Sequence, residues 1–280
     1  MAAPPREQVR NRILASLPAE DYARLAPDLV RVELETKQVV FDVDRPIEHV
    51  YFPEASIVSI LGVMADGTAV ETATIGREGM AGLPVFLGTD QMSAQAFTQV
   101  AGPALRMAAD TFRAAAGSSP ALTRALHRYT QALFTFVAQS SACNRVHAMS
   151  QRCARWLLHT HDRVERDEFP LTHQFLSQML GVRRATVTEA MGALQAGGSI
   201  AYEMGQVRVR DRAGLEAAAC ECYAIVTREF DRLLDGVEAR ARQVPNPFAD
   251  LTTAEGGRST LGDGLAPGGS DEPNTPDRRD

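Results

Sequence analysis

Several polar side chains between residues 171 and 194 have the chemistry and spacing to contact nucleic acid. Arginine donates to guanine and to phosphate, while hydroxyl and carboxylate groups exchange hydrogen bonds with base edges. Most of the set falls within a few consecutive positions, so one short helix would present it at its N-terminal end. We therefore expect double-stranded DNA as the ligand, contacted by Thr172, Gln174, Arg183, Arg184, Thr186, Thr188 and Glu189.

Two short helices around a sharp turn are predicted to position these side chains. Thr172 is suited to cap the first helix, and Gly181 supplies the left-handed residue that ends it. The second helix begins after Val182 and repeats apolar residues at spacings of four and three. The predicted buried faces are Phe175, Leu176, Met179 and Leu180 in the first helix, and Val187, Met191 and Leu194 in the second.

A glycine-containing hairpin follows the second helix. Residues 197–210 have the pattern of two strands around a glycine turn, which predicts a wing. A helix-turn-helix alone is a weak signal, but the same pair followed by a winged hairpin is far more specific. Residues 150–212 hold 9 basic and 7 acidic side chains, a small local excess of positive charge in a chain whose net charge is -6.

The stretch after Pro120 repeats bulky residues at alternating spacings of four and three, without proline or glycine for more than four turns. Such a seam in a long helix usually packs against a partner helix. We therefore predict a homodimer contact formed by Leu122, Leu126, Tyr129, Leu133 and Phe136. The alternative is a core helix that packs on its own β-domain.

The N-terminal part of the chain has the pattern of short antiparallel strands. Six alternating runs lie between residues 30 and 100, separated by turn residues. The predicted fold class is α+β: an N-terminal antiparallel, jelly-roll-like β-roll, a long dimerisation helix and a C-terminal winged helix-turn-helix. The predicted boundaries are 1–118 for a sensor β-roll, 119–149 for the dimerisation helix, 150–223 for the winged helix-turn-helix, 224–244 for a C-terminal helix and 245–280 for a disordered acidic tail.

Composition predicts a folded cytoplasmic protein. A chain of 280 residues with 45% hydrophobic and 23% charged content has enough apolar surface for a core. The sequence contains no apolar run long enough to span a bilayer and no apolar signal-peptide core at its N-terminus. We therefore expect no membrane partner.

Few residues stand out for catalysis or metal binding. No convincing set of nucleophile, base and acid is evident, so we predict no enzymatic activity. Cys220 and Cys222 are a candidate thiolate pair for metal or redox sensing, but no matching pair is near, and ordinary packing is preferred. His159 and His161 are candidate haem or metal ligands, for which a solvated helix end is preferred. We expect no metal and no cofactor.

Three segments carry a family resemblance: Val50-Tyr51-Phe52-Pro53-Glu54, Gly76-Arg77-Glu78-Gly79-Met80 leading to Gly82-Leu83-Pro84, and Gly181-Val182-Arg183-Arg184-Ala185-Thr186-Val187. Over residues 10–223 the chain resembles the Crp/Fnr family of transcription regulators. The resemblance implies a cyclic-nucleotide-binding-like β-roll, a dimerisation helix and a winged helix-turn-helix. It also implies that Arg184 matches the arginine that reads guanine in relatives. The expected partners are DNA and a second copy of the chain, with RNA polymerase as a further candidate.

The sequence departs from nucleotide-responsive relatives at the expected ligand site. Where those relatives hold ribose with Gly-Glu and the cyclic phosphate with Arg-Ser, this chain has Ala81-Gly82 and Met92-Ser93-Ala94. A buried phosphate without a compensating charge is strongly disfavoured. We therefore expect an effector other than conventionally bound cAMP, of unknown identity, in a pocket near Gly82, Leu83 and Ser93.

Together these features predict a homodimeric transcription regulator that reads a palindromic operator. The rival hypothesis is a small-molecule or redox sensor that signals through protein contact, with the winged helix as its interaction surface. Salt dependence distinguishes the two, because DNA binding releases counterions and a mostly apolar protein contact does not.

Overall fold

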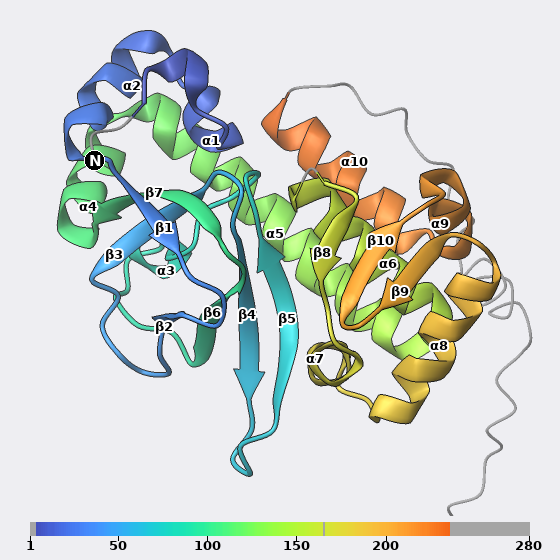
Figure 1. Cartoon of the computed structure of the whole chain (residues 1–280). Helices are drawn as coiled ribbons and strands as arrows, with labels where there is room; N and C mark the ends of the chain where they lie inside the picture. Colours follow the sequence, from blue (N-terminus) through green and yellow to red (C-terminus); the bar gives the residue numbers. More distant parts are fainter. Residues whose placement is uncertain (1–3, 165, 236–280) are drawn as a thin grey trace, which may run out of the picture. The chain divides into compact units, whose positions relative to one another are not determined.

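The computed structural model describes residues 4–164 and 166–235 (Figure 1). These residues form a β-roll from strands β1 to β7, a long helix α5, and a second unit with the small sheet β8 to β10. The predicted tail at 245–280, and the part of the predicted C-terminal helix after residue 235, lie outside the described residues.

Two antiparallel sheets make up the β-roll. One has the strand order β1-β7-β3 and the other β2-β6-β4-β5. Alternate side chains point inward, as Val50 and Phe52 of β3 and Leu105 and Met107 of β7 show by their burial. The strands are β1 (Val30–Leu34), β2 (Val39–Phe41), β3 (His49–Pro53), β4 (Ile57–Val63), β5 (Ala69–Ile75), β6 (Ala94–Val100) and β7 (Gly102–Ala108).

Strand β7 is the central strand of its sheet, and the sequence pattern did not indicate it. Gly102 and Pro103 have the composition of a turn, yet Pro103 pairs with Glu33 near the beginning of β7. A proline is tolerated there because the missing N–H affects only the end of the ladder. Pairing then continues from Ala104 to Ala108 between β1 and β3.

Short helices cover the β-roll. Asn11 caps α1, since Leu14 N donates to its Oδ1 at 3.3 Å, and its Nδ2 donates to the carbonyl oxygens of Pro53 and Gly79 at 3.0 and 2.8 Å. One side chain therefore begins the helix and attaches it to two β-roll segments. The helices are η1 (Arg6–Gln8), α1 (Arg12–Ala15), α2 (Ala19–Leu25), η2 (Ala26–Asp28), α3 (Leu83–Phe86) and α4 (Ala109–Ser118).

The long helix α5 (Pro120–Val146) buries its predicted seam inside the chain. Leu122, Leu126, Tyr129 and Phe136 are buried in the core shared with the β-roll and α10 (Cys222–Leu234), and Leu133 is half-buried against it. Hence four of the five residues predicted as dimer contacts are core residues, and that assignment is wrong for them. The heptad spacing arises because α10 and the β-roll impose on α5 the periodicity that a partner helix would impose.

The elements from α6 to α9 form what we call the reading head. Its core includes Trp156, Leu176, Val187 and Met191, and the β-roll residue Phe97 packs against it. The elements are α6 (Met149–Val164), β8 (Glu168–Pro170), α7 (His173–Leu180), α8 (Arg184–Ala196), β9 (Ile200–Glu203), β10 (Gln206–Val209) and α9 (Arg212–Ala218). The predicted fold class is confirmed. Within the described residues, none of the helices has both the length and the apolar character that a membrane crossing requires.

Candidate nucleic-acid interface

The turn between α7 and α8 has the geometry that its residues predict. Thr172 Oγ1 accepts from Phe175 N at 3.1 Å and so caps α7. Gly181 ends α7 with φ 65° and ψ 40°, a left-handed conformation that glycine adopts without strain. A Cβ added to Gly181 would lie 3.1 Å from Val70 Cγ2 on β5, so the turn also lies close to the β-roll.

Helix α8 separates a buried face from an exposed beginning. Val187, Met191 and Leu194 are buried, as the spacing predicts. Arg183 is the N-cap and Arg184 the first residue of α8, and both side chains are exposed. The free backbone N–H groups of a helix start also favour phosphate binding. Of the predicted DNA contacts, the exposed ones are Thr172, Gln174, Arg183, Arg184, Thr188 and Glu189, while Thr186 is half-buried.

Thr188 has a second role inside the reading head. Its hydroxyl donates to the Arg184 carbonyl oxygen at 3.0 Å and lies 3.0 Å from His173 Nδ1. The His173 ring in turn stacks on Tyr202 of β9, with centroids 4.3 Å apart. Since a hydroxyl has one proton and two lone pairs, Thr188 keeps little capacity to form a further hydrogen bond with a base edge. Its contacts instead tie α8 to α7 and the wing.

The wing presents side chains that the sequence analysis did not select. Met204 and Gly205 both have positive φ, 46° and 78°, which is the pattern of a type I′ hairpin turn. The Met204 side chain is 98% exposed at this tip. Arg208 is paired with Glu168, whereas Arg210 is exposed beside it at the end of the wing. The alternation of β10 was the available signal, because it directs Arg208 away from the buried Val207 and Val209, and Arg210 follows directly after the strand.

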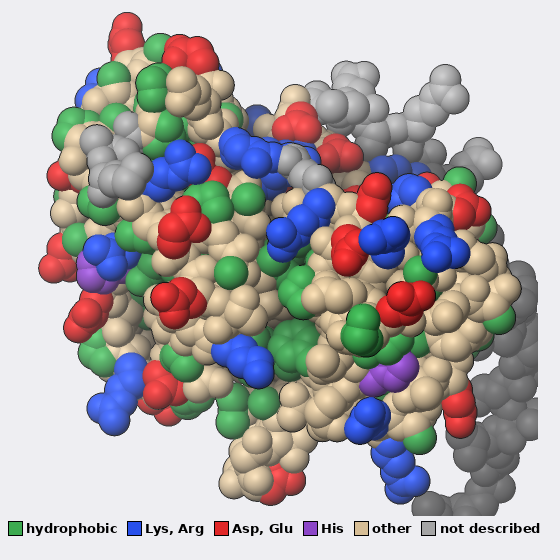
Figure 2. All heavy atoms as spheres, in the orientation of Figure 1, with side chains coloured by type: hydrophobic (Ala, Val, Ile, Leu, Met, Phe, Trp, Pro, Cys, Tyr) green, Lys and Arg blue, Asp and Glu red, His purple; other side chains and the backbone are tan. Residues whose placement is uncertain are grey.

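Figure 2 shows basic side chains on this face at the start of α8 and over the wing strands, with acidic side chains among them. The field near the reading head is therefore mixed rather than uniformly positive. Recognition must depend on the placement of individual arginines more than on bulk charge.

A buried ion pair joins the β-roll to the reading head. Arg163 of α6 donates from Nε and Nη2 to Glu78 Oε1 at 2.9 and 2.7 Å, and the two side chains are 6% and 9% exposed. Burial alone would raise the pKa of Glu78, but the charge and hydrogen bonds of Arg163 outweigh that effect and lower it. A Cβ on Gly76 would lie 2.5 Å from Arg163 Cδ, so the close approach of Arg163 requires glycine at this position.

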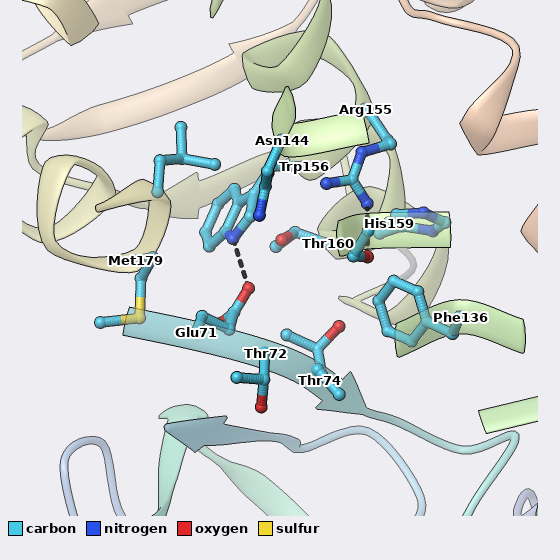
Figure 3. Close-up of a pocket in the computed structure, with 13 residues that line it drawn as sticks. Glu71, Thr72, Thr74, Phe136, Asn144, Arg155, Trp156, His159, Thr160 and Met179 are labelled. Carbon is cyan, nitrogen blue, oxygen red and sulfur yellow. Dashed lines mark hydrogen bonds between the residues drawn. The ribbon is translucent and has the colours of Figure 1, made fainter. Parts of the chain in front are cut away.

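A second polar contact crosses the same boundary at a cavity of about 30 Å³ (Figure 3). Trp156 Nε1 of α6 donates to Glu71 Oε1 of β5 at 2.8 Å, and Ser59 Oγ bonds Glu71 Oε2 at 2.8 Å. Burial of the carboxylate raises the pKa of Glu71 to about 7, although both hydrogen bonds lower it in part. Glu71 is therefore partly protonated near neutral pH, and its protonated form can donate as well as accept.

This pKa predicts a pH dependence of stability. Between the ordinary value of 4.5 and about 7, folded Glu71 binds a proton that the unfolded chain releases. Stability contributed by Glu71 should therefore fall as pH rises through this range, with a slope of up to about 1.4 kcal/mol per pH unit. Urea unfolding of the parent and of Glu71→Gln across this range should show that the variant's free energy of unfolding rises relative to that of the parent as pH rises. Parallel pH profiles for the two proteins would contradict the assignment.

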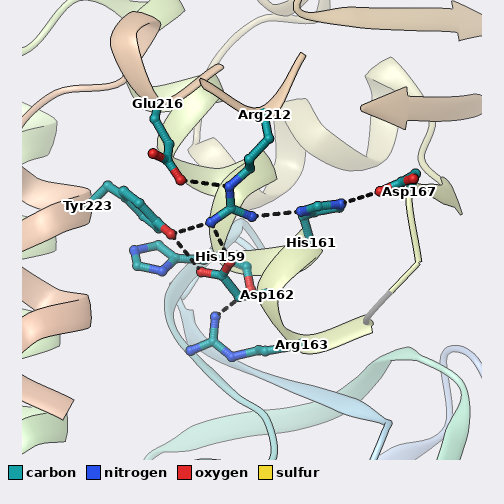
Figure 4. A network of polar contacts seen from close by, with 8 residues as sticks. All are labelled: His159, His161, Asp162, Arg163, Asp167, Arg212, Glu216 and Tyr223. Atoms are coloured by element: carbon teal, nitrogen blue, oxygen red, sulfur yellow. Dashed lines mark hydrogen bonds and ion pairs between the residues drawn. The ribbon is translucent and has the colours of Figure 1, made fainter. Parts of the chain in front are cut away.

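A polar network holds the reading head together (Figure 4). Arg212 of α9 bonds Asp162 Oδ1 and His161 Nδ1 of α6, each at 2.6 Å, and His161 Nε2 lies 2.9 Å from Asp167. His161 Nδ1 must accept from the guanidinium, so Nε2 carries the proton that Asp167 accepts. His159 is buried, with its ring near those of Phe136 and Tyr223, and burial lowers its pKa well below the ordinary value. The prediction of a solvated helix end is thus wrong for His159.

A wider cleft of about 900 Å³ lies between the β4–β5 side of the β-roll and the start of α8, the second helix of the helix-turn-helix, which we call the recognition helix. Its walls include Gln95 and Phe97 from the β-roll and Arg183 and Arg184 from the reading head. The predicted effector region does not line this cleft. At Gly82 an added Cβ would meet Val50 Cγ1 at 3.0 Å, Leu83 is buried, and Ser93 is exposed. Core side chains thus fill the space beside Gly82.

The cysteine prediction also needs correction. The expectation that no further ligand lies near Cys220 and Cys222 is wrong, because Cys143 and His147 at the end of α5 reach them in the fold. The four ligand atoms lie within 4.8 Å of one another.

Comparisons with known proteins agree with this geometry. Residues 151–218 match the Crp-like helix-turn-helix domain family. No curated protein matches the chain. FixK2 from Bradyrhizobium japonicum superposes with a TM-score of 0.56 at 17% identity, covering 69% of this chain and 98% of its own. The c-di-GMP-responsive global regulator CLP of Xanthomonas campestris gives 0.57 at 16% identity, covering 69% and 99%. A CRP/FNR-family transcriptional regulator from Thermus thermophilus gives 0.56 at 19% identity, covering 68% and 98%.

The matched segment begins in α6 and ends in α9, so it contains the complete helix-turn-helix and wing. The solved structures share the β-roll, the long helix and the reading head in the same order. The chain therefore contains a Crp-like helix-turn-helix domain, and as a whole it has the fold of solved transcription regulators of the Crp/Fnr family.

Proposed function

We propose that the chain acts as a homodimer that reads a twofold-symmetric operator through the start of α8. The exposure of Arg183 and Arg184 on a helix whose opposite face is anchored by Val187, Met191 and Leu194 carries this proposal. Arginine is suited to bidentate contact with guanine, and a helix held by its apolar face offers these side chains at fixed positions. Arg184 is proposed to read guanine, and Arg183 is proposed to contact a phosphate.

The dimer surface is proposed on the side of α5 that faces away from the core. Phe134 is 69% exposed and Val137 39% exposed, although both are large apolar residues. They lie on the helix that joins the β-roll to the reading head, and members of the family typically dimerise. A second copy packed along this side would bury both and place two reading heads on one side of a DNA duplex.

We propose further that an effector other than conventionally bound cAMP changes the position of the reading head. The chain lacks the Gly-Glu and Arg-Ser pairs, and core side chains fill the space at Gly82. The Xanthomonas campestris regulator is described as responsive to c-di-GMP, so ligands other than cAMP have a precedent on this fold. Glu78–Arg163, Glu71–Trp156 and the Val70–Gly181 contact are the connections through which a shift of the β-roll would reach the reading head.

Selection of binding sites from random duplex DNA by the purified full chain tests the proposed function. We expect an inverted repeat whose half-sites lie about one helical turn, ~34 Å, apart, because two heads enter successive major grooves. Phe134→Glu should weaken dimerisation and specific binding together, whereas Arg145→Glu, also exposed on α5, serves as a control that introduces the same side chain. Enrichment of no sequence, or of single half-sites bound by monomers, would overturn the proposal.

A further inference from the structure

Four potential metal ligands from two distant segments meet at the base of the reading head. Cys143 lies in the last turn of α5 and His147 is the C-cap of that helix, while Cys220 precedes α10 by two residues and Cys222 is its first residue. Cys143 Sγ lies 3.5 Å from Cys220 Sγ, and Cys222 Sγ lies 3.5 Å from His147 Nδ1. All four ligand atoms lie within 4.8 Å of one another.

Two of these separations, at 3.5 Å each, are close to those around a single tetrahedral ion, and the wider ones, all within 4.8 Å, would shorten when an ion binds. With Zn–S bonds of about 2.3 Å and Zn–N bonds of about 2.0 Å, neighbouring ligand atoms lie about 3.5–3.8 Å apart. Three thiolates and one imidazole are an established ligand set for structural zinc. An iron–sulfur cluster needs its cysteines farther apart, because several irons and sulfides must fit between them.

The surroundings suit a negatively charged metal centre. The three cysteines are buried and free of disulfides, and Gln139 Nε2 donates to Cys222 Sγ at 3.1 Å. His147 Nδ1 faces the thiols, while its Nε2 lies 3.3 Å from Glu221 Oε2. A carboxylate on the outer nitrogen is the usual way to fix the orientation of a metal-binding histidine.

Two buried arginines beside the cluster supply positive charge. Arg152 interacts electrostatically with Cys143 and Cys220, and Arg155 with Cys143. The Nε atoms of both arginines are buried and have no hydrogen-bond partner among the described residues. Three thiolates around a divalent cation leave one net negative charge, which these guanidinium groups would compensate.

We propose that Cys143, His147, Cys220 and Cys222 bind one zinc ion, which fastens the two ends of the DNA-binding domain to each other. The first pair immediately precedes the reading head and the second immediately follows it. Arg152 Nη2 also donates to the Leu180 carbonyl oxygen at 3.0 Å, at the end of α7. Bound zinc therefore fixes how the reading head is attached to α5, and its loss loosens the connection between the β-roll and the recognition helix.

Metal analysis of the reduced, full-length chain tests this proposal. We expect one zinc per chain after purification without chelator, and replacement by Co²⁺ should give the visible and thiolate charge-transfer bands of a tetrahedral S₃N site. Cys143→Ser, Cys220→Ser, Cys222→Ser and His147→Ala should each lose bound metal. Cys153→Ser is the matched control, because Cys153 is equally buried but is outside the cluster.

Two further variants distinguish the loss of a metal ligand from misfolding of the chain. His147→Cys should retain zinc, because it restores a four-ligand set, and Glu221→Gln should fold normally yet bind zinc roughly 10–100-fold more weakly. Absence of zinc and of a cobalt spectrum in the reduced parent would overturn the proposal. A chain that always forms a Cys143–Cys220 disulfide and is never obtained in the reduced state would also overturn it. Equal metal content in Glu221→Gln and in the parent at limiting zinc would do the same.

Discussion

Glu78→Gln should lower the free energy of unfolding by about 3–5 kcal/mol, because it leaves the Arg163 guanidinium buried without its counter-charge. The remaining hydrogen-bond acceptors of Arg163 are the carbonyl oxygens of His159 at 2.8 Å and Thr74 at 3.5 Å, and neither carries a charge. A loss of this size is a large fraction of the stability of a typical domain. Urea unfolding with an unchanged m-value would measure it.

Two controls separate the buried charge from other causes. The double variant Glu78→Gln/Arg163→Met removes both charges and should recover part of the loss. Glu168→Gln breaks the exposed pair with Arg208 and should cost less than about 1 kcal/mol. If Glu78→Gln were as stable as Glu168→Gln, the ion pair would not hold the β-roll and reading head together.

Affinity for the selected operator should fall roughly 10²-fold between about 50 and 200 mM salt, the loss expected for about four neutralised phosphates. Arg183 and Arg210 are exposed on the same reading head and give about four phosphate-contacting arginines in a dimer, whereas Arg184 is proposed to read guanine and Arg208 is already paired with Glu168. The slope of log K against log salt would be about −4. Fluorescence anisotropy with a labelled operator across this range measures it.

This salt slope also separates the proposal from signalling through protein contact. Arg210→Gln should reduce the slope by about two, one for each copy in the dimer, with similar losses on all duplexes. Arg232→Gln is a matched control, since Arg232 is paired with Glu229 on α10 rather than exposed at the reading head. A slope near zero would favour an apolar protein partner over DNA.

The local features of the interface could be predicted from sequence because neighbouring residues determine them. The Thr172 cap depends on a bond three residues away, and the left-handed Gly181 on its missing Cβ. The buried positions Val187, Met191 and Leu194 follow from helical spacing alone. The fold class followed from the order of such local patterns along the chain.

Features that depend on distant segments were mispredicted or missed. The periodicity of α5 showed that one face is buried, but could not tell a partner helix from α10 of the same chain. The cysteine cluster joins residues 77 positions apart, so the spacing of Cys220 and Cys222 alone gave no sign of Cys143. The Glu78–Arg163 pair spans 85 positions and was missed for the same reason. In each case the partner residues come from a distant segment that only tertiary packing brings close.

The affinity of Arg184→Ala for the selected operator is the most direct test of the central claim that the start of α8 reads DNA. Binding should weaken by about 1–3 kcal/mol per half-site, and the variant should no longer distinguish the operator from one with a substituted guanine. The exposed neighbour Arg183 should behave differently: Arg183→Ala should weaken binding to both duplexes alike. Equal affinity and equal discrimination by Arg184→Ala and the parent would contradict the claim.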